Sequence, residues 1–94
     1  MSADKTNDRD NLEIWRKRLI FRSSHRGKKE MDIIMASFAG QNVGEFDEEQ
    51  LRQYEDILTF NDADLYDWLT GKRKAPEEVR SCPVFQQLAR HRIA

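Results

Sequence analysis

The sequence contains one cysteine, Cys82, among its 94 residues, so no disulfide can form within the chain. A small chain without disulfides is typical of a reducing compartment. The two histidines, His25 and His91, are spread along the sequence with no second cysteine nearby. This spacing gives neither a metal-ligand pattern nor a redox-active cysteine pair, and we therefore predict that the protein holds no metal ion.

Long apolar runs are also missing, and no stretch approaches the roughly 20 residues that a transmembrane helix needs. The polar, acidic start from Met1 to Asp10 resembles neither a secretory signal nor an arginine-rich transit peptide. We expect the protein to stay in the cytoplasm where it is made, without inserting into a membrane. Residues 1–9 are expected to form a disordered tail.

The sequence has almost no net charge, −1 at neutral pH, but the two signs are segregated along it. Between positions 16 and 29 there is no acidic residue, and the basic residues are Arg16, Lys17, Arg18, Arg22, Arg26, Lys28 and Lys29. Between positions 45 and 67 nearly all charged residues are acidic, and Arg52 is the exception. Such a dipolar surface would orient a protein partner during encounter, although segregated charge is also typical of solvated helices.

The residues that are present can build one small helical domain. A hydrophobic fraction of 38%, which includes five Phe, two Trp and two Tyr, supplies one modest core and leaves no room for a second. Apolar residues recur at helical spacing, and no convincing strand pattern is found. We predict an all-α fold, a single-domain bundle of about five helices over residues 10–92.

Capping residues and apolar spacing place the individual helices. We expect a first helix over 10–23, capped by Asp8 or Asp10, and a second over 27–39, followed by a loop over 40–44. A third helix is expected to be capped by Asp47, with the Gln50 side chain reaching back to the cap and Phe46 packing on Leu51. A fourth is expected to run from Asn61 or Asp62 to Gly71, and a final helical segment to open at Pro76 and to be interrupted near Pro83. The predicted buried faces are Leu12, Trp15, Leu19 and the stem of Arg22; Met31, Ile34, Met35 and Phe38; Leu51, Tyr54, Ile57 and Leu58; Leu65, Trp68 and Leu69; and Val79, Val84, Phe85 and Leu88.

The most informative short segment is Arg26-Gly27-Lys28-Lys29-Glu30. On a helix, residues four apart share one face, so Arg26 and Glu30 would present a cation and a carboxylate side by side. Gly27 would leave the backbone bare, and a partner's main chain would be able to approach it closely. The alternative reading is an ordinary ion pair on a solvated helix, with Gly27 as the turn that precedes it.

Two segments carry a resemblance to a known family. Residues 18–32, with the sequence Arg-Leu-Ile-Phe-Arg-Ser-Ser-His-Arg-Gly-Lys-Lys-Glu-Met-Asp, and Phe38 after them resemble the Arg-Gly-x-x-Glu region of the SdhE family. Residues 61–69, with the sequence Asn-Asp-Ala-Asp-Leu-Tyr-Asp-Trp-Leu, resemble that family's Asp-x-Asp-Leu-aromatic-x-Trp-Leu segment at a similar distance. The likeness spans about Leu12 to Gly71. Lys28 stands where many relatives carry an uncharged residue, and the segment after Lys74 matches only loosely.

The resemblance implies a function and a partner. SdhE proteins are small bacterial assembly factors that bind the flavoprotein subunit of succinate dehydrogenase, or of the related fumarate reductase, and promote covalent attachment of its FAD. The link forms between the flavin and a histidine of the partner, so the assembly factor supplies no nucleophile and holds no cofactor stably. On this resemblance we expect a non-enzymatic, monomeric assembly factor, with no bound nucleic acid.

The resemblance also implies the site residues. Arg26, Gly27 and Glu30 would contact the partner, with Asp32 and His25 beside them, Arg26 donating hydrogen bonds and Glu30 accepting them or orienting Arg26. The sequence guarantees no constellation of serine, cysteine or carboxylate around His25 that would make it a catalytic acid or base, and no catalytic residue is predicted.

Two functions of other classes remain open from the residues alone. The basic segment 16–29 would suit a small helical module that binds nucleic acid, and its complex would be sensitive to salt. The acidic middle of the chain and the absence of a recognisable helix-turn-helix signature disfavour that reading. A regulator that acts on membrane or cell-division proteins through the same surface is the other alternative.

Overall fold

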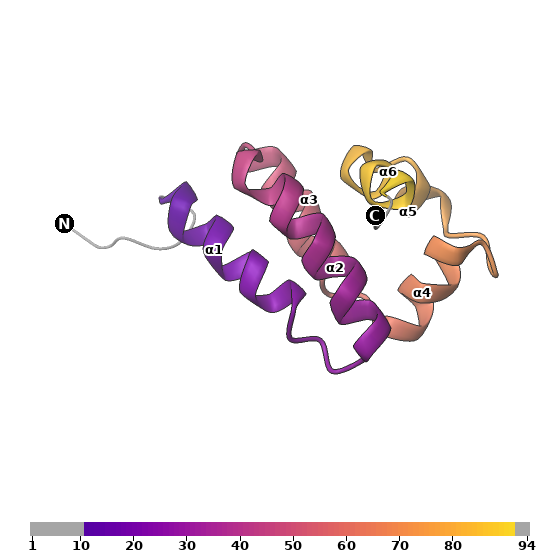
Figure 1. The fold of residues 1–94 in the computed structure, drawn as a ribbon. Helices are drawn as coiled ribbons and strands as arrows, with labels where there is room; N and C mark the ends of the chain where they lie inside the picture. Colours follow the sequence, from indigo (N-terminus) through magenta and orange to yellow (C-terminus); the bar gives the residue numbers. More distant parts are fainter. Residues whose placement is uncertain (1–10, 92–94) are drawn as a thin grey trace.

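Residues 11–91 of the computed structural model are described here, so the predicted tail over residues 1–9 and the last three residues lie outside the described part. The elements in chain order are α1 (Leu12–Ser23), α2 (Lys29–Asn42), a 3₁₀ helix η1 (Val43–Glu45), α3 (Glu48–Ile57), α4 (Asp62–Thr70), α5 (Glu77–Arg80) and α6 (Pro83–Arg90) (Figure 1). Every element in residues 11–91 is helical, which confirms the all-α prediction. The final segment is divided into α5 and α6 at Pro83, as expected.

Helix α1 begins at a different cap from the predicted one. The cap is Asn11, whose Oδ1 accepts hydrogen bonds from the backbone N–H groups of Glu13 and Ile14 at 3.1 and 3.2 Å. The buried face carries Trp15, Leu19 and Ser23, which are spaced at intervals of four residues. The predicted place of the Arg22 stem on this face is wrong, because the Arg22 side chain is 45% exposed and Ser23 is the buried residue instead.

Helix α2 is shifted toward the C-terminus relative to the prediction. It begins at Lys29 and continues through Gly40 to Asn42, so the predicted loop over residues 40–44 is wrong. A glycine inside a helix costs about 1 kcal/mol relative to alanine. Continuation of the helix buries Ala39 and delivers Val43 to the core, and burial of such apolar side chains offsets that cost.

The caps of α3 and α4 agree with the prediction. The Asp47 side chain accepts a hydrogen bond from the Gln50 backbone N–H, and the Gln50 side chain accepts one from the Asp47 backbone N–H, both at 2.9 Å. Helix α4 is capped by Asn61 and ends at Gly71, whose φ of +81° lies in the left-handed region that favours glycine. The Asp47 cap fixes where α3 begins, and the Asn61 cap fixes where the turn between α3 and α4 ends.

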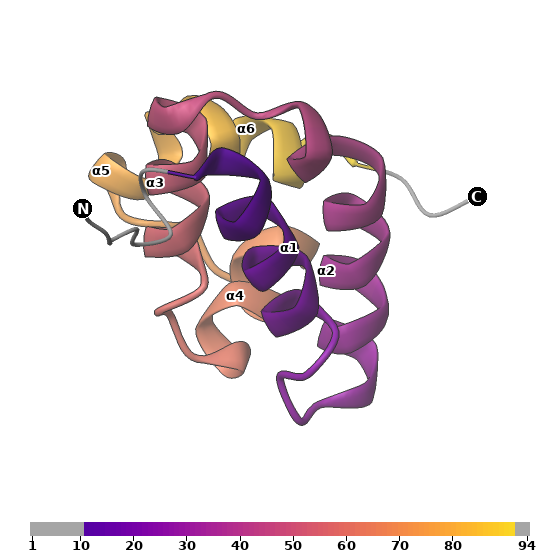
Figure 2. The same cartoon turned by 90° about the vertical axis from the view of Figure 1, so that its left-hand side faces the viewer.

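The helices enclose one core. Helix α1 packs on both α2 and α3, and α6 covers α3 on its other side (Figures 1 and 2). The buried apolar side chains are Trp15, Leu19, Met31, Met35, Phe38, Ala39, Val43, Phe46, Leu51, Tyr54, Ile57, Leu58, Leu65, Ala75, Val79, Val84, Phe85 and Leu88. Trp68 is half-buried and meets Phe60 and Phe85 edge to face, which agrees with its predicted structural role.

A buried chain of hydrogen bonds joins α1 to α3. The hydroxyls of Ser23 and Tyr54 lie 2.5 Å apart, and the Ser23 hydroxyl donates to the carbonyl oxygen of Leu19 at 2.7 Å. Because the single Ser23 hydroxyl proton is donated to that carbonyl oxygen, the Tyr54 hydroxyl is the donor in its bond with Ser23 Oγ. Burial raises the pKa of Tyr54 to about 12. Tyr54 is thus kept neutral in the core.

Candidate functional site

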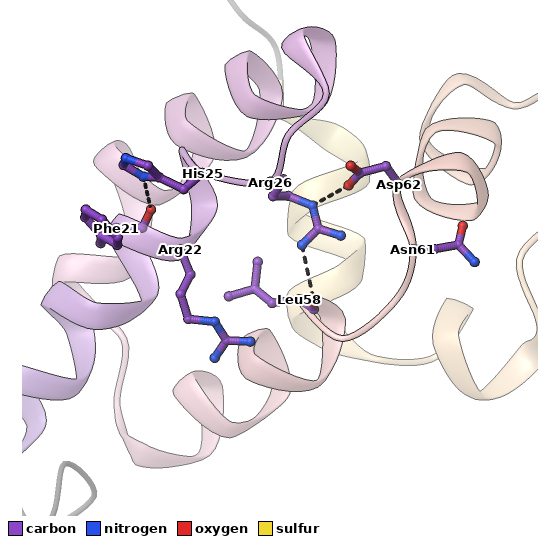
Figure 3. A pocket seen from close by; sticks show the side chains of 7 residues that line it. All are labelled: Phe21, Arg22, His25, Arg26, Leu58, Asn61 and Asp62. Carbon is purple, nitrogen blue, oxygen red and sulfur yellow. Dashed lines mark hydrogen bonds and ion pairs between the residues drawn. The ribbon is translucent and has the colours of Figure 1, made fainter.

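Arg26 is held by two backbone carbonyls of the α3–α4 turn, which comprises residues 58–61, and by Asp62, the first residue of α4. Its Nε donates to Asp62 Oδ1 at 2.5 Å, and a terminal nitrogen donates to the carbonyl oxygen of Leu58 at 3.1 Å (Figure 3). The other terminal nitrogen donates to the carbonyl oxygen of Phe60 at 2.5 Å. The Arg26 and Asp62 side chains are only 9% and 13% exposed. Since the guanidinium is a rigid planar fork, these contacts fix the α1–α2 loop, residues 24–28, against the turn.

Arg26 and Glu30 do not share a helix face, contrary to the prediction. Helix α2 begins at Lys29, so Arg26 and Gly27 lie in the loop before it. Gly27 has a φ of +98°, which L side chains rarely adopt, and a Cβ built there would meet no atom within 4 Å. Gly27 is therefore the turn before the helix, as the alternative reading had it, and its backbone is also bare on the outside.

The two carboxylates in the first turn of α2 behave differently. Asp32 Oδ1 accepts a hydrogen bond from the backbone N–H of Arg26 at 2.7 Å, which ties the loop to the helix. Glu30 is exposed, and within residues 11–91 it makes no ion pair and no side-chain hydrogen bond. The predicted orientation of Arg26 by Glu30 is therefore wrong, since Asp62 orients Arg26. Glu30 is left available for contacts outside the chain.

His25 is stacked on Phe21 at the edge of the same loop. The two rings are nearly parallel, at 18°, with centroids 3.9 Å apart. His25 Nδ1 lies 2.8 Å from the carbonyl oxygen of Phe21. A carbonyl oxygen only accepts, so Nδ1 carries a proton and donates it. The Phe21 ring is 62% exposed, and its stacking on the hydrogen-bonded His25 ring restricts its position.

Two hollows flank the Arg26–Asp62 pair. The larger, of about 540 Å³, is lined by Phe21, Arg22, His25, Arg26, Leu58, Asn61 and Asp62 (Figure 3). The smaller, of about 190 Å³, is lined by Lys28, Glu30, Met31, Asp62, Ala63 and Tyr66. Asp62 lines both, so the two hollows form one continuous surface with the buried ion pair between them. We call this surface, defined by those lining residues, the saddle.

The segregated charges of the sequence meet across the fold. Arg22 lies 3.5 Å from Glu55, and Arg26 is paired with Asp62. Arg16 is turned inward, where its Nε and a terminal nitrogen donate to the carbonyl oxygen of Phe46 at 3.1 and 2.8 Å. These cations of the basic segment are therefore committed to their own chain, and the geometry gives no support to the nucleic-acid alternative, which needs them on phosphates.

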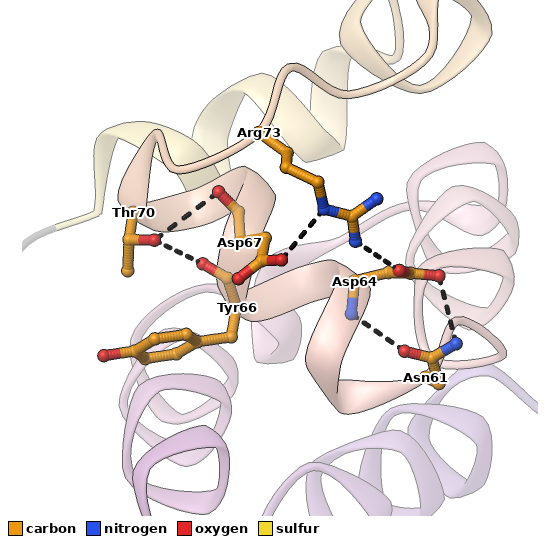
Figure 4. Close-up of polar contacts among 6 residues, drawn as sticks. All are labelled: Asn61, Asp64, Tyr66, Asp67, Thr70 and Arg73. Atoms are coloured by element: carbon orange, nitrogen blue, oxygen red, sulfur yellow. Dashed lines mark hydrogen bonds and ion pairs between the residues drawn. The ribbon is translucent and has the colours of Figure 1, made fainter.

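A second arginine clamps α4 on another side. Arg73 Nε donates to Asp67 Oδ2 at 2.8 Å, and a terminal nitrogen donates to Asp64 Oδ1 (Figure 4). The neighbouring carboxylates raise the pKa of Arg73. The Arg73 side chain is 52% exposed, so this cluster lies in solvent. The Tyr66 ring leaves α4 in another direction, pointing away from Arg73 (Figure 4).

The structure thus gathers Arg26, Gly27, Glu30, Asp32 and His25 around the loop 24–28 and the start of α2. It divides them by role, since Arg26 and Asp32 are engaged inside the chain whereas Glu30 and His25 are exposed.

Sequence reasoning missed several members of this site, among them Asp62, Phe21, Leu58 and Tyr66. The sequence places Asp62 only in the second matching segment and at the possible start of a helix. It places Phe21 only in the first matching segment and Leu58 only in the core. A usable signal existed for Asp62, because both matching segments contain a charged residue, of opposite sign, next to a helix start. No sequence signal indicated that backbone carbonyls would bind Arg26.

In the described part of the chain, no group of three or more His, Cys, Asp or Glu side chains is placed to hold a metal ion. Among the helices of residues 11–91, none is both long and apolar enough to cross a membrane.

A family model and the similar proteins agree on one family for this chain. The sequence model of a family described as "Flavinator of succinate dehydrogenase" matches residues 17–92. A relative from Acetobacter pasteurianus, the FAD assembly factor SdhE, is 39% identical over 79 residues, which cover 84% of this chain and 72% of that protein. Both matching segments lie within the range that the family model covers.

Eukaryotic proteins are similar as well. The mitochondrial succinate dehydrogenase assembly factor 2 of Arabidopsis thaliana is 37% identical over 76% of this chain, and that of Dictyostelium discoideum is 38% identical over 80%. The chain spans only 38% and 53% of the length of these two proteins. The likeness is therefore to one part of each of these longer relatives.

Proposed function

Since this chain belongs to the family of flavinators of succinate dehydrogenase, we propose that it binds the flavoprotein subunit of succinate dehydrogenase, or of the related fumarate reductase, and promotes covalent attachment of FAD to it. The flavin belongs to the partner, and the chain itself holds no cofactor stably. Its part in the reaction is that of an assembly factor and not of an enzyme.

One observation carries the proposal. The two segments that resemble the family, residues 18–32 and 61–69, are far apart in the sequence, yet they meet at the hydrogen bond between Arg26 and Asp62, which are separated by 36 positions. Family resemblance and tertiary contact therefore point to the same surface, the saddle. Surfaces built from a rigid frame with exposed groups on it are well suited to protein recognition.

The mechanism we propose is conformational. In the loop 24–28 the Ser24 hydroxyl lies 3.0 Å from His25 Nδ1, but it donates to the Phe21 carbonyl oxygen at 3.1 Å, and Nδ1 carries a proton, so His25 is not placed to activate Ser24 through this contact. Cys82 lies elsewhere, half-buried, where its thiol donates to Gln53 Oε1 at 3.3 Å. The chain would instead hold the flavoprotein in an arrangement in which its own histidine and flavin are in position to react. Fixing two reacting groups in the right geometry can supply several kcal/mol of a barrier, of the order of 7 to 11 in the best cases.

The site residues then have distinct roles in the proposed contact. Arg26 and Asp32 act as the frame, because they hold the loop and keep Gly27 at its positive φ. Gly27 offers bare backbone for close approach of the partner's main chain. Glu30 accepts hydrogen bonds from the partner, and His25 contributes its exposed ring.

We further propose that the free protein is a monomer and that it acts in the bacterial cytoplasm. The single cysteine, which fits a reducing compartment, supports the location. Size-exclusion chromatography with light scattering would measure the oligomeric state, and cell fractionation would give the location.

The test of the function is in-gel flavin fluorescence of the denatured flavoprotein subunit. Cells that lack this chain are compared with cells complemented by the wild type. We expect the fluorescence of covalently bound flavin to be lost without the chain and restored by the wild-type protein. Undiminished fluorescence in the cells that lack the chain would contradict the proposed function.

Two variants of Gly27 then locate the contact. Gly27→Ala and Gly27→Arg share the backbone strain of a side chain at positive φ, but only arginine adds a long cation at the surface. With folding verified by circular dichroism, we expect Gly27→Arg to abolish restoration and Gly27→Ala to retain most of it. Equal loss in both variants would assign the effect to the backbone, and full restoration by Gly27→Arg would move the contact elsewhere.

A further inference from the structure

Large apolar side chains are exposed at four places in residues 11–91, and two of them line the saddle. The four are Ile14, Phe21, Ile33 and Tyr66, with exposed fractions of 41%, 62%, 48% and 38%. Phe21 lines the larger hollow and Tyr66 the smaller one. Single exposed hydrophobic residues are normal on protein surfaces. An aromatic ring in each hollow, on both sides of a buried ion pair, is a more specific arrangement.

The larger hollow offers an exposed aromatic ring beside one other apolar side chain, that of Leu58. Phe21 is stacked on His25, and the hydrogen bond from His25 Nδ1 to the Phe21 carbonyl oxygen holds the two together (Figure 3). Leu58 supplies further apolar surface at the same hollow. A ring that is already held in place loses little conformational entropy on binding, so it can anchor an apolar side chain of a partner at low cost.

The smaller hollow combines an aromatic ring with a carboxylate. Tyr66 and Glu30 both line it, and Glu30 has no ion-pair partner within the described residues. The Tyr66 ring points away from the Arg73 cluster, which leaves it directed to this side (Figure 4). A basic side chain placed here would gain both a charge-assisted hydrogen bond and contact with the face of an aromatic ring.

We propose that Phe21 and Tyr66 are the two anchors of the flavoprotein-binding surface. The flavoprotein presents an apolar side chain to the Phe21–His25 stack and a basic side chain to Tyr66 and Glu30. This inference rests on the proposed function and adds two residues that lie outside the Arg-Gly-x-x-Glu signature.

Continuity with the signature residues selects this partner. His25 and Arg26 line the larger hollow, and Glu30 lines the smaller, so each anchor shares its hollow with the surface proposed to meet the flavoprotein. Binding energy at protein interfaces is concentrated in a few residues, among which aromatic side chains are enriched. A partner seated on His25 and Glu30 would therefore meet the two hollows in which the rings lie.

The test measures binding of the purified flavoprotein subunit to the full chain by titration calorimetry. Phe21→Ala and Tyr66→Ala are compared with Ile14→Ala and Ile33→Ala, which remove exposed apolar side chains that line neither hollow. We expect each anchor variant to weaken Kd about tenfold or more, as hot-spot truncations do, and each control variant to change it by less than about twofold. Thermal unfolding of every variant checks that the fold is retained.

The possible outcomes separate the inference from the function on which it rests. If Phe21→Ala and Tyr66→Ala bind as tightly as the controls while the wild type restores flavin attachment, the anchors are wrong and the proposed function stands. Equal weakening by all four variants would also overturn the inference. If the wild-type chain neither binds the flavoprotein nor affects its flavin, both are overturned.

Discussion

Two arginines, Arg26 and Arg73, each bind a carboxylate of α4, and they differ in their exposure to solvent and in the distance along the sequence to their partners. Arg26 and its partner Asp62 are 9% and 13% exposed, and Arg26 also binds two backbone carbonyls of the α3–α4 turn. Arg73 is 52% exposed, and its partners Asp64 and Asp67 are 37% and 21% exposed. Both sites contain short contacts between a guanidinium and a carboxylate. Only the first joins segments that are distant in sequence.

This difference in burial indicates which of the two ion pairs determines the local structure. Water and salt screen an exposed pair, and its net contribution to stability is small. A pair taken out of water is not necessarily stabilising as a whole, but loss of one partner leaves the other buried and uncompensated. We therefore expect Arg26 to decide the shape of the saddle, and Arg73 to be dispensable for it.

The largest expected effect is that of Arg26→Ala. The substitution leaves the Asp62 carboxylate and the carbonyls of Leu58 and Phe60 without their donor, and we expect the free energy of unfolding to fall by about 3 kcal/mol. Urea denaturation followed by circular dichroism measures this change. Arg26→Lys, which keeps the charge but not the planar fork, is expected to fall in between. A loss for Arg26→Ala no larger than that for Arg73→Ala would contradict the contrast drawn here.

Tyr54 is a third buried polar group, and its protonation makes the stability of the protein depend on pH. Its pKa is raised to about 12 in the folded state, mainly by burial, against about 10 in the unfolded chain. The unfolded state then binds fewer protons between these pH values, so stability is full below about pH 10 and falls as the pH rises toward 12. We expect a loss of about 2 to 3 kcal/mol over that window.

The check on this pH dependence is Tyr54→Phe, which has no phenol to ionise. Its unfolding free energy is expected to fall less steeply between pH 10 and 12 than that of the wild type. The Ser23 hydroxyl keeps its bond to the Leu19 carbonyl oxygen in this variant, so the comparison isolates the titration. Parallel pH profiles for the two proteins would show that Tyr54 is not the responsible group.

A smaller effect is expected at Gly27, inside the loop that Arg26 holds. Alanine there meets no neighbouring atom, so the cost is that of positive φ alone, about 1 kcal/mol. Chemical denaturation of Gly27→Ala measures it. Substitution of the exposed Gly40, which lies inside α2, is the matched control, and Gly40→Ala is expected to stabilise the protein slightly. A stabilising Gly27→Ala would mean that the loop does not require a positive φ.

The smallest expected effect is that of Arg73→Ala. Because its partners are open to solvent, we expect the unfolding free energy to change only at low ionic strength, and the change to vanish in added salt. Denaturation curves at low and high salt test this. A loss that persists at high salt would mean that Arg73 is as structural as Arg26.

The sequence predicted the fold well where local signals were strong. The capping box at Asp47 and Gln50 and the ends of α4 at Asn61 and Gly71 depend on residues adjacent in the chain, and both were found as expected. The end of α2 was missed because Gly40 was read as a helix terminator. Burial of Ala39 and Val43, a tertiary effect, outweighs the local preference of glycine.

The candidate site was only partly predictable. The positions of the signature residues could be read from the chain, but not the role of Arg26, because its partners lie about 35 residues away and two of them are backbone carbonyls. A backbone carbonyl carries no sequence signal. The exposure of Phe21 could not be predicted either, since a phenylalanine is more often buried than exposed.

The most direct test of the central claim, that the saddle is where the flavoprotein binds, uses two exposed glutamates. Glu30 lies in the saddle and Glu78 lies on α5, and neither makes an ion pair within residues 11–91. Each is replaced by alanine, and in-gel flavin fluorescence of the flavoprotein subunit is measured in cells complemented with the variant. We predict that Glu30→Ala lowers the fluorescence strongly and that Glu78→Ala leaves it unchanged. Full fluorescence with Glu30→Ala would contradict the account.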